Sequence, residues 1–113
     1  MHEMSLCESI LQVIESQAQA SAFQRVLLVR LEVGVLAGVE WPAMEFGWEV
    51  VTRGTLADGA RLERIEVPGS AWCFACAESV PISRIGESCP KCGGFQLQVG
   101  TGEELRIKDL QVE

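Results

Sequence analysis

The chain has 113 residues, of which 48% are hydrophobic and 22% are charged, so it suits one domain with a core and is too apolar to be disordered. Nine Lys and Arg against sixteen Asp and Glu give a formal net charge of −7, the wrong sign for binding a phosphate backbone. No stretch reaches the roughly 20 apolar residues that a membrane-spanning helix needs, and the first residues do not resemble a signal peptide. We therefore expect a cytoplasmic protein that binds neither nucleic acid nor membrane, in a reducing compartment where paired cysteines favour metals over disulfides.

Two segments have the residue spacing of an amphipathic helix. The first covers residues 4–20, and the second covers residues 42–53, which begin at a proline and stop before Gly54. Apolar side chains at steps of three and four predict which positions face the core. These positions are Leu6, Ile10, Val13, Ile14 and Gln17 in the first helix, and Met44, Trp48 and Val51 in the second.

Four segments have the composition of strands. Residues 25–33 alternate, with Val29, Leu31 and Val33 on one face. The other predicted strands are residues 60–67, 95–99 and 104–112. Since the last strand can pair with the N-terminal ones, we expect an α+β fold in which residues 1–69 and 95–113 form a small sheet with two helices, and residues 70–94 are an inserted zinc-ribbon domain.

The inserted segment holds four of the five cysteines and few large aliphatic side chains, so side chains alone cannot build its core. The pairs Cys73-Phe-Ala-Cys76 and Cys89-Pro-Lys-Cys92 are separated by twelve residues, a spacing that predicts a tetrahedral four-thiolate zinc site. Four protein ligands leave no open position, so this zinc is expected to be structural. A redox pair and two disulfides are weaker alternatives, because neither pair opens the helix of a βαβ unit and the compartment is reducing.

His2 is the only histidine and directly follows Met1. The Met1 amine, the His2 amide nitrogen and imidazole, and the Glu3 amide or carboxylate can surround one ion, a nitrogen-rich set that suits Ni(II) or Cu(II) better than zinc. For His2, the simpler alternative is a solvated side chain near a chain terminus. For Glu3, the structural alternative is that its negative charge complements the N-terminus of the first predicted helix. Cys7 lies one step from the predicted apolar face, and we expect it to be a half-buried core residue without a function.

The opening Met1-His2-Glu3-Met4-Ser5, the two CxxC pairs and the closing Glu104-Leu-Arg-Ile-Lys-Asp-Leu-Gln-Val together resemble the HypA/HybF family of nickel metallochaperones for nickel–iron hydrogenase maturation. The similarity spans essentially the whole chain. It implies that His2 binds Ni(II) with help from the Met1 amine and the Glu3 backbone or side chain. It also implies zinc ligands, which are Cys73, Cys76, Cys89 and Cys92.

The resemblance also implies a role for Glu40 and a set of partners. Glu40 lies where relatives carry an acidic residue near the nickel site, and a solvated loop carboxylate is the equal alternative. The implied partners are the maturation GTPase HypB and the hydrogenase large-subunit precursor, and some relatives also serve urease maturation. Because the chain has no phosphate-binding loop and no nucleophile arrangement, we expect no enzyme activity. A zinc-ribbon protein-interaction module without nickel transfer is the alternative function.

Overall fold

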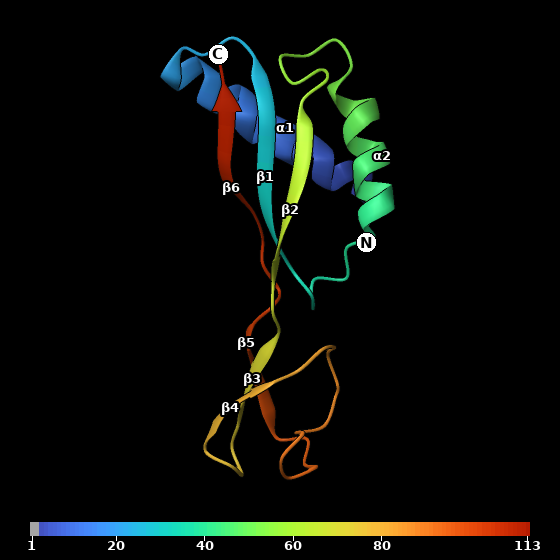
Figure 1. Cartoon of the computed structure of the whole chain (residues 1–113), viewed down its shortest axis with the longest axis vertical. Coiled ribbons are helices and arrows are strands. Elements are labelled where there is room, and N and C mark those ends of the chain that lie inside the picture. The colour runs from blue at the N-terminus through green and yellow to red at the C-terminus, as the bar shows by residue number, and fades with distance from the viewer. Residues whose placement is uncertain (1–2) are drawn as a thin grey trace. The chain divides into compact units, whose positions relative to one another are not determined.

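The computed structural model describes residues 3–113, so the predicted nickel ligands Met1 and His2 lie outside the described residues. Two helices and six strands are present (Figure 1). The helices are α1 (Glu3–Ser21) and α2 (Trp41–Thr52), and the strands are β1 (Val26–Gly34), β2 (Arg61–Val67), β3 (Ser70–Cys73), β4 (Glu78–Pro81), β5 (Leu97–Thr101) and β6 (Leu105–Val112). The predicted α+β class is confirmed. Within the described residues, no helix is both long enough and apolar enough to cross a membrane.

The strands form two three-stranded sheets, with the orders β2-β1-β6 and β4-β3-β5. The predicted pairing of the last strand with the first one is therefore confirmed. The chain also divides into two compact units. The first contains the described residues of Met1–Leu31 together with Val39–Arg64 and Ile107–Glu113, and the second contains Glu32–Gly38 and Ile65–Arg106.

The core of the first unit lies between its helices and strand β1. Val29 and Leu31 are buried on β1, as expected for one face of an alternating strand, whereas Val26 is buried at the start of the strand outside this alternation. Ile14 of α1 and Met44 of α2 are completely buried as well. Figure 1 shows α1 running behind the strands with α2 beside it. The alternation in the sequence therefore predicted the correct inner face of β1.

The predicted apolar face of α1 is rotated from the observed one. The buried positions are Glu3, Cys7, Leu11 and Ile14, whereas Val13 is 51% exposed. Leu11 was outside the predicted face, and Cys7 is fully buried instead of half-buried. The reason is the close approach of α2, where a Cβ on Gly47 would lie only 3.4 Å from Cys7 Sγ. Small groups on both helices allow this approach, and α2 thereby decides which stripe of α1 is covered.

Cys7 is an inert thiol in this interface. Its Sγ donates to the carbonyl oxygen of Met44 at 3.4 Å and lies 3.8 Å from the Met44 sulfur. Burial raises the pKa of the Cys7 thiol to about 11, and the charges of Glu3 and Glu8 add to this effect. The thiol therefore stays protonated at neutral pH and acts as a small apolar side chain of the core.

The second unit contains two strands that the sequence pattern did not reveal. Strand β3 pairs antiparallel with β4 on one side and with β5 on the other, so that Trp72 lies opposite Ser79 and Gln98. Strand β5 begins two residues later than predicted. Strands β3 and β4 have four residues each, too few for alternation to be recognised against turn residues.

Three glycines make close backbone contacts within the second unit. A Cβ on Gly34 would lie 1.8 Å from the carbonyl oxygen of Gly102, and a Cβ on Gly102 would lie 2.7 Å from the Cα of Gly69. Hydrogen bonds hold this crossing together, because Gly34 N–H donates to Glu104 O and Leu36 N–H donates to Gly102 O, both at 2.7 Å. Only glycine fits where backbones approach so closely. Gly69 directly precedes strand β3, and Gly102 directly follows strand β5, so this contact lies where the chain enters and leaves the second sheet.

Candidate metal centres

The four cysteines of the two CxxC pairs converge in the second unit. Their sulfur atoms all lie within 4.8 Å of one another. The sulfurs of Cys73 and Cys92 are 3.7 Å apart, and those of Cys76 and Cys89 are 3.9 Å apart. Tetrahedral zinc with Zn–S bonds of about 2.3 Å requires sulfurs roughly 3.8 Å apart. The arrangement therefore has the dimensions of a closed four-thiolate zinc site.

Each CxxC pair sits in a turn of the same design. Ala77 N–H donates to Cys73 O, and Gly93 N–H donates to Cys89 O, each at 2.8 Å. Ala77 and Gly93 follow the first cysteine of their pairs by four positions, and both have a positive φ, 54° and 74°. The left-handed conformation turns the chain so that both sulfurs of a pair face the same side. Gly93 could be recognised in the sequence, but Ala77 could not, because alanine rarely adopts this conformation.

Backbone amides also point at the thiols. Cys76 N–H donates to the sulfur of Cys73, and Gly94 N–H donates to the sulfur of Cys92, each at 3.4 Å. Such amides stabilise negative charge on sulfur and orient the ligands of a metal.

The protonation of the four thiols is uneven. Hydrogen bonds from the backbone N–H groups of Cys92 and Lys91 lower the pKa of Cys89 to about 7. In contrast, hydrogen bonds to Cys92 and Cys73 hold the proton on Cys76 and raise its pKa to about 12. Four sulfurs this close cannot all carry negative charge unless a cation lies between them. A divalent ion supplies that charge and releases the remaining protons.

The core around this cluster is small. Buried Cys73 and Cys89 pack with Val80, and Cys76 and Leu97 lie against them. Lys91, in the second turn, forms an ion pair with Glu78 of β4. Ala71 and Ile82 are also buried in this unit, but the interior is still as small as in domains that need a metal to stay folded.

The start of α1 is joined to the start of α2 in the first unit. The Glu3 carboxylate accepts a hydrogen bond from the backbone N–H of Glu40 at 3.1 Å. Glu40 is the N-cap of α2 and makes no capping bond with its own side chain. Glu3 is 9% exposed, so its carboxylate is a buried cap supplied from another helix. The sequence interpretation recognised the helix-start role of Glu3 but assigned it to α1 alone.

Next to this contact, Trp41 is covered by a cation. The guanidinium of Arg64 lies 5.2 Å from the centroid of the Trp41 ring, within the range of a cation–π interaction. The side chain of Glu40 is exposed. The structure thus places Glu40 beside Glu3, and it places the four cysteines in the other unit.

Fold and site together define a class: an α+β protein whose second, small sheet carries a closed four-thiol metal site. The family model described as "Hydrogenase/urease nickel incorporation, metallochaperone, hypA" matches residues 1–112. The chain therefore belongs to the HypA family of nickel metallochaperones, as the resemblance in its sequence indicated.

Relatives over the full length agree with this assignment. A hydrogenase maturation factor HypA from Alkalilimnicola ehrlichii is 60% identical, and one from Azotobacter vinelandii is 53% identical, each over 113 residues and 100% of both chains. The solution structure of the nickel metallochaperone HypA from Helicobacter pylori matches with a TM-score of 0.70 at 18% identity, covering 99% of this chain and 97% of that one. At that identity, the structural match supports the fold alone.

Proposed function

We propose that this protein binds one Ni(II) ion through the Met1 amine, His2 and Glu3, and delivers it for hydrogenase maturation. Membership of the HypA family carries this proposal, because the match includes the MHE motif at residues 1–3. Amine, imidazole and deprotonated amide nitrogens form a set that Ni(II) prefers. The partners in this proposal are the maturation GTPase HypB, which loads or unloads nickel, and the hydrogenase large-subunit precursor, both in the cytoplasm. Urease maturation proteins are further candidate partners.

Glu3 contributes to this site mainly by position. Its carboxylate already accepts the N–H of Glu40, so its backbone nitrogen is the group that we assign to nickel. The buried contact holds the residue after His2 against the start of α2. In this proposal the exposed carboxylate of Glu40, whose backbone N–H is bonded to Glu3, orients a nickel ligand through a hydrogen bond.

The four cysteines hold a structural zinc ion in this proposal. Cys73, Cys76, Cys89 and Cys92 fill all four tetrahedral positions, so no position remains for a substrate. Nickel transfer therefore takes place elsewhere, by exchange of ligands one at a time. Nitrogen donors at a chain terminus suit such exchange, because an incoming donor can replace the amine or the imidazole while the others still hold the ion.

Metal analysis of the untagged protein tests the nickel site. We expect one tightly bound zinc and one exchangeable nickel per chain, with Met1 retained in the intact mass. His2→Ala should lower the nickel affinity at least about tenfold and leave the zinc content unchanged. Adding residues before Met1 should have the same effect, because it removes the amine without changing a side chain. Glu8→Gln, an exposed change on α1, is the control.

Wild-type nickel affinity in the His2→Ala protein would contradict the proposal. A protein that holds zinc but takes up no nickel would instead favour the zinc-ribbon interaction module.

A second pair of variants separates the two possible roles of Glu3. Glu3→Gln keeps an oxygen that can accept the Glu40 N–H, whereas Glu3→Ala removes the cap and should cost about 1 kcal/mol in urea unfolding. If the carboxylate only anchors, Glu3→Gln retains nickel binding and Glu3→Ala weakens it. Loss of nickel binding in Glu3→Gln at unchanged stability would show that the carboxylate itself binds the metal.

A further inference from the structure

The start of α1, residues 3–7, lies directly against the middle of α2. Gly47 of α2 is buried, and a Cβ placed on it would lie 3.5 Å from the Cα and 3.7 Å from the backbone nitrogen of Met4. The same Cβ would lie 3.4 Å from the sulfur of Cys7. Two helix backbones come this close only where the side chain between them is very small. Gly47 thus brings α2 next to the backbone of the residue that follows Glu3.

Two other contacts join the start of α1 to α2. The Glu3 carboxylate accepts the backbone N–H of Glu40, the N-cap of α2, at 3.1 Å. The Cys7 thiol donates to the carbonyl oxygen of Met44 at 3.4 Å, and Met44 lies one turn before Gly47 on the same side of α2. Together with the contact at Gly47, these hydrogen bonds mean that α2 supports the start of α1 at three points.

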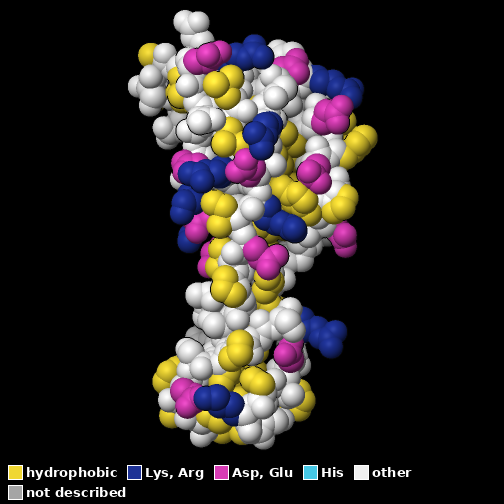
Figure 2. All heavy atoms as spheres, viewed as in Figure 1, with side chains coloured by type: hydrophobic (Ala, Val, Ile, Leu, Met, Phe, Trp, Pro, Cys, Tyr) yellow, Lys and Arg dark blue, Asp and Glu magenta, His cyan; other side chains and the backbone are white. Residues whose placement is uncertain are grey.

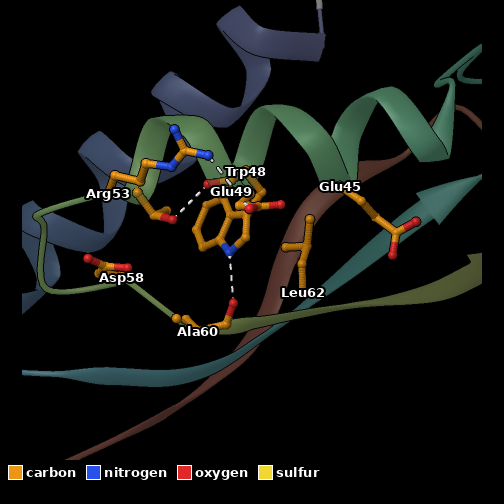
Figure 3. A pocket seen from close by; sticks show the side chains of 9 residues that line it. Glu45, Trp48, Glu49, Arg53, Asp58, Ala60 and Leu62 are labelled. Carbon is orange, nitrogen blue, oxygen red and sulfur yellow. Dashed lines mark hydrogen bonds and ion pairs between the residues drawn. The ribbon is translucent and has the colours of Figure 1, made fainter.

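Helix α2 is itself held in place next to this contact. Trp48, the neighbour of Gly47, is 4% exposed, and its indole Nε1–H donates to the carbonyl oxygen of Ala60 at 3.1 Å (Figure 3). Trp48 and Ala60 also line a cavity of about 490 Å³, but a shift of α2 would break their hydrogen bond. The start of α1 is less restrained, because Met4 is 40% exposed. A larger side chain at position 47 would therefore displace the start of α1 before it displaces α2.

The position of residues 3–7 matters for the nickel site proposed above. The proposed ligands are the Met1 amine, His2 and the backbone nitrogen of Glu3, and Glu3 is the first residue of α1. A nitrogen-rich Ni(II) site requires its donors to lie close to one plane, and a metal site tolerates displacements of only about 0.5 Å. Because α2 holds Glu3 and the residue after it, α2 also determines where the Glu3 nitrogen lies.

We propose that Gly47 is a positioning residue of the nickel site. It supplies no ligand, but its lack of a side chain lets α2 hold the start of α1 where nickel requires the Glu3 nitrogen. Helix propensity does not explain a glycine at this place, because glycine inside a helix is less favourable than alanine. The inference rests on the nickel site proposed at residues 1–3, and it adds a residue from another helix to that site.

Nickel affinities of untagged, zinc-loaded variants, measured by competition with a chelator, test this role. In Gly47→Ala the added Cβ makes ordinary contacts of 3.4 Å or more, so we expect the nickel affinity of the unchanged protein. In Gly47→Val the γ carbons extend about 1.5 Å further, toward the backbone of Met4. The nickel affinity should therefore fall at least about tenfold, with the zinc content unchanged. Ala43→Val places valine at an exposed position of α2 and should leave the nickel affinity unchanged.

A spectroscopic readout separates positioning from a general loss of stability. The visible absorption spectrum of bound Ni(II) reports its coordination geometry, and it should change in Gly47→Val but not in Gly47→Ala. Ile14→Val shortens a completely buried side chain farther along α1 and destabilises the protein. Because it leaves residues 3–7 unchanged, it should keep the spectrum and the nickel affinity of the unchanged protein.

Wild-type nickel affinity and spectrum in Gly47→Val, or equal losses of affinity in Gly47→Val and Ile14→Val, would overturn the role of Gly47 and leave the nickel site itself intact. The nickel site fails instead if His2→Ala keeps wild-type nickel binding. If Gly47→Val does not fold, Gly47→Ser decides the question, because it adds only one atom to the alanine side chain. A lowered nickel affinity in Gly47→Ser supports the positioning role, and wild-type affinity overturns it.

Discussion

Replacement of Cys89 by Ser is expected to unfold the sheet β4-β3-β5 while leaving α1, α2 and β1 folded. The cluster at that sheet consists of cysteine sulfurs with Val80 and Leu97, and Ala71 and Ile82 add only a little buried hydrophobic surface. Structural zinc contributes roughly 10–16 kcal/mol to the folding of comparable small domains. Loss of one ligand leaves the other three sulfurs without a tetrahedral site. No apolar core of sufficient size remains to replace the metal.

Each unit contains a tryptophan that reports on it, Trp72 in β3 and Trp48 in α2. In Cys89→Ser, the indole resonance of Trp72 should move to its random-coil position, and that of Trp48 should stay. Chelation of zinc from the unchanged protein should produce the same spectrum. Cys7→Ala removes the one thiol outside the cluster and should keep one zinc per chain.

A dispersed Trp72 resonance without zinc would show that side-chain packing alone holds the second sheet. Loss of both tryptophan resonances would show that the two units do not fold independently.

Replacement of Gly34 by Ala is expected to cost about 3 kcal/mol or more. The added Cβ would lie 1.8 Å from the carbonyl oxygen of Gly102 and 2.8 Å from the backbone nitrogen of Glu103. Backbone cannot move aside like a flexible side chain, so the hydrogen bond from Leu36 N–H to Gly102 O at 2.7 Å must break. Overpacking a tight site costs about 1–3 kcal/mol, and the lost hydrogen bond adds to this.

Gly38→Ala is the matched control for this substitution. Gly38 has a φ of +68°, and a Cβ there would meet nothing within 4 Å. It therefore measures the cost of the left-handed backbone alone, about 1–2 kcal/mol. Urea unfolding followed through Trp72 provides the comparison. If Gly34→Ala is no more destabilising than Gly38→Ala, the three-glycine crossing has room to relax.

The second unit carries large hydrophobic side chains on its surface. Trp72, Phe74 and Phe95 are all well exposed, and hydrophobic atoms reach the surface over this unit (Figure 2). A patch of this kind commonly marks a contact surface.

For helix α1, the sequence predicted the ends of the helix better than the face that is buried. Its bounds were predicted to within one residue, because apolar spacing and the strand that follows are local signals. Its buried face was predicted only in part, because apolar residues occur on several neighbouring faces: Ile14 is buried as predicted, but Val13 is exposed. The choice among them depends on which stripe meets α2, and Cys7 opposite Gly47 permits the closest approach.

Sequence alone indicated both helices, four of the six strands in the described residues, and the four cysteines that come together. Ligand type and the spacing within each CxxC pair are local properties, and four thiolates at this spacing have few other uses. The tertiary structure decided which groups meet over long separations. It joined the Glu3 carboxylate to the N–H of Glu40, 37 residues away, packed Gly34 against Gly102, and enclosed a cavity over Trp48. Such contacts depend on how helices and strands that are distant in the sequence pack closely against each other, and a local sequence pattern does not contain this information.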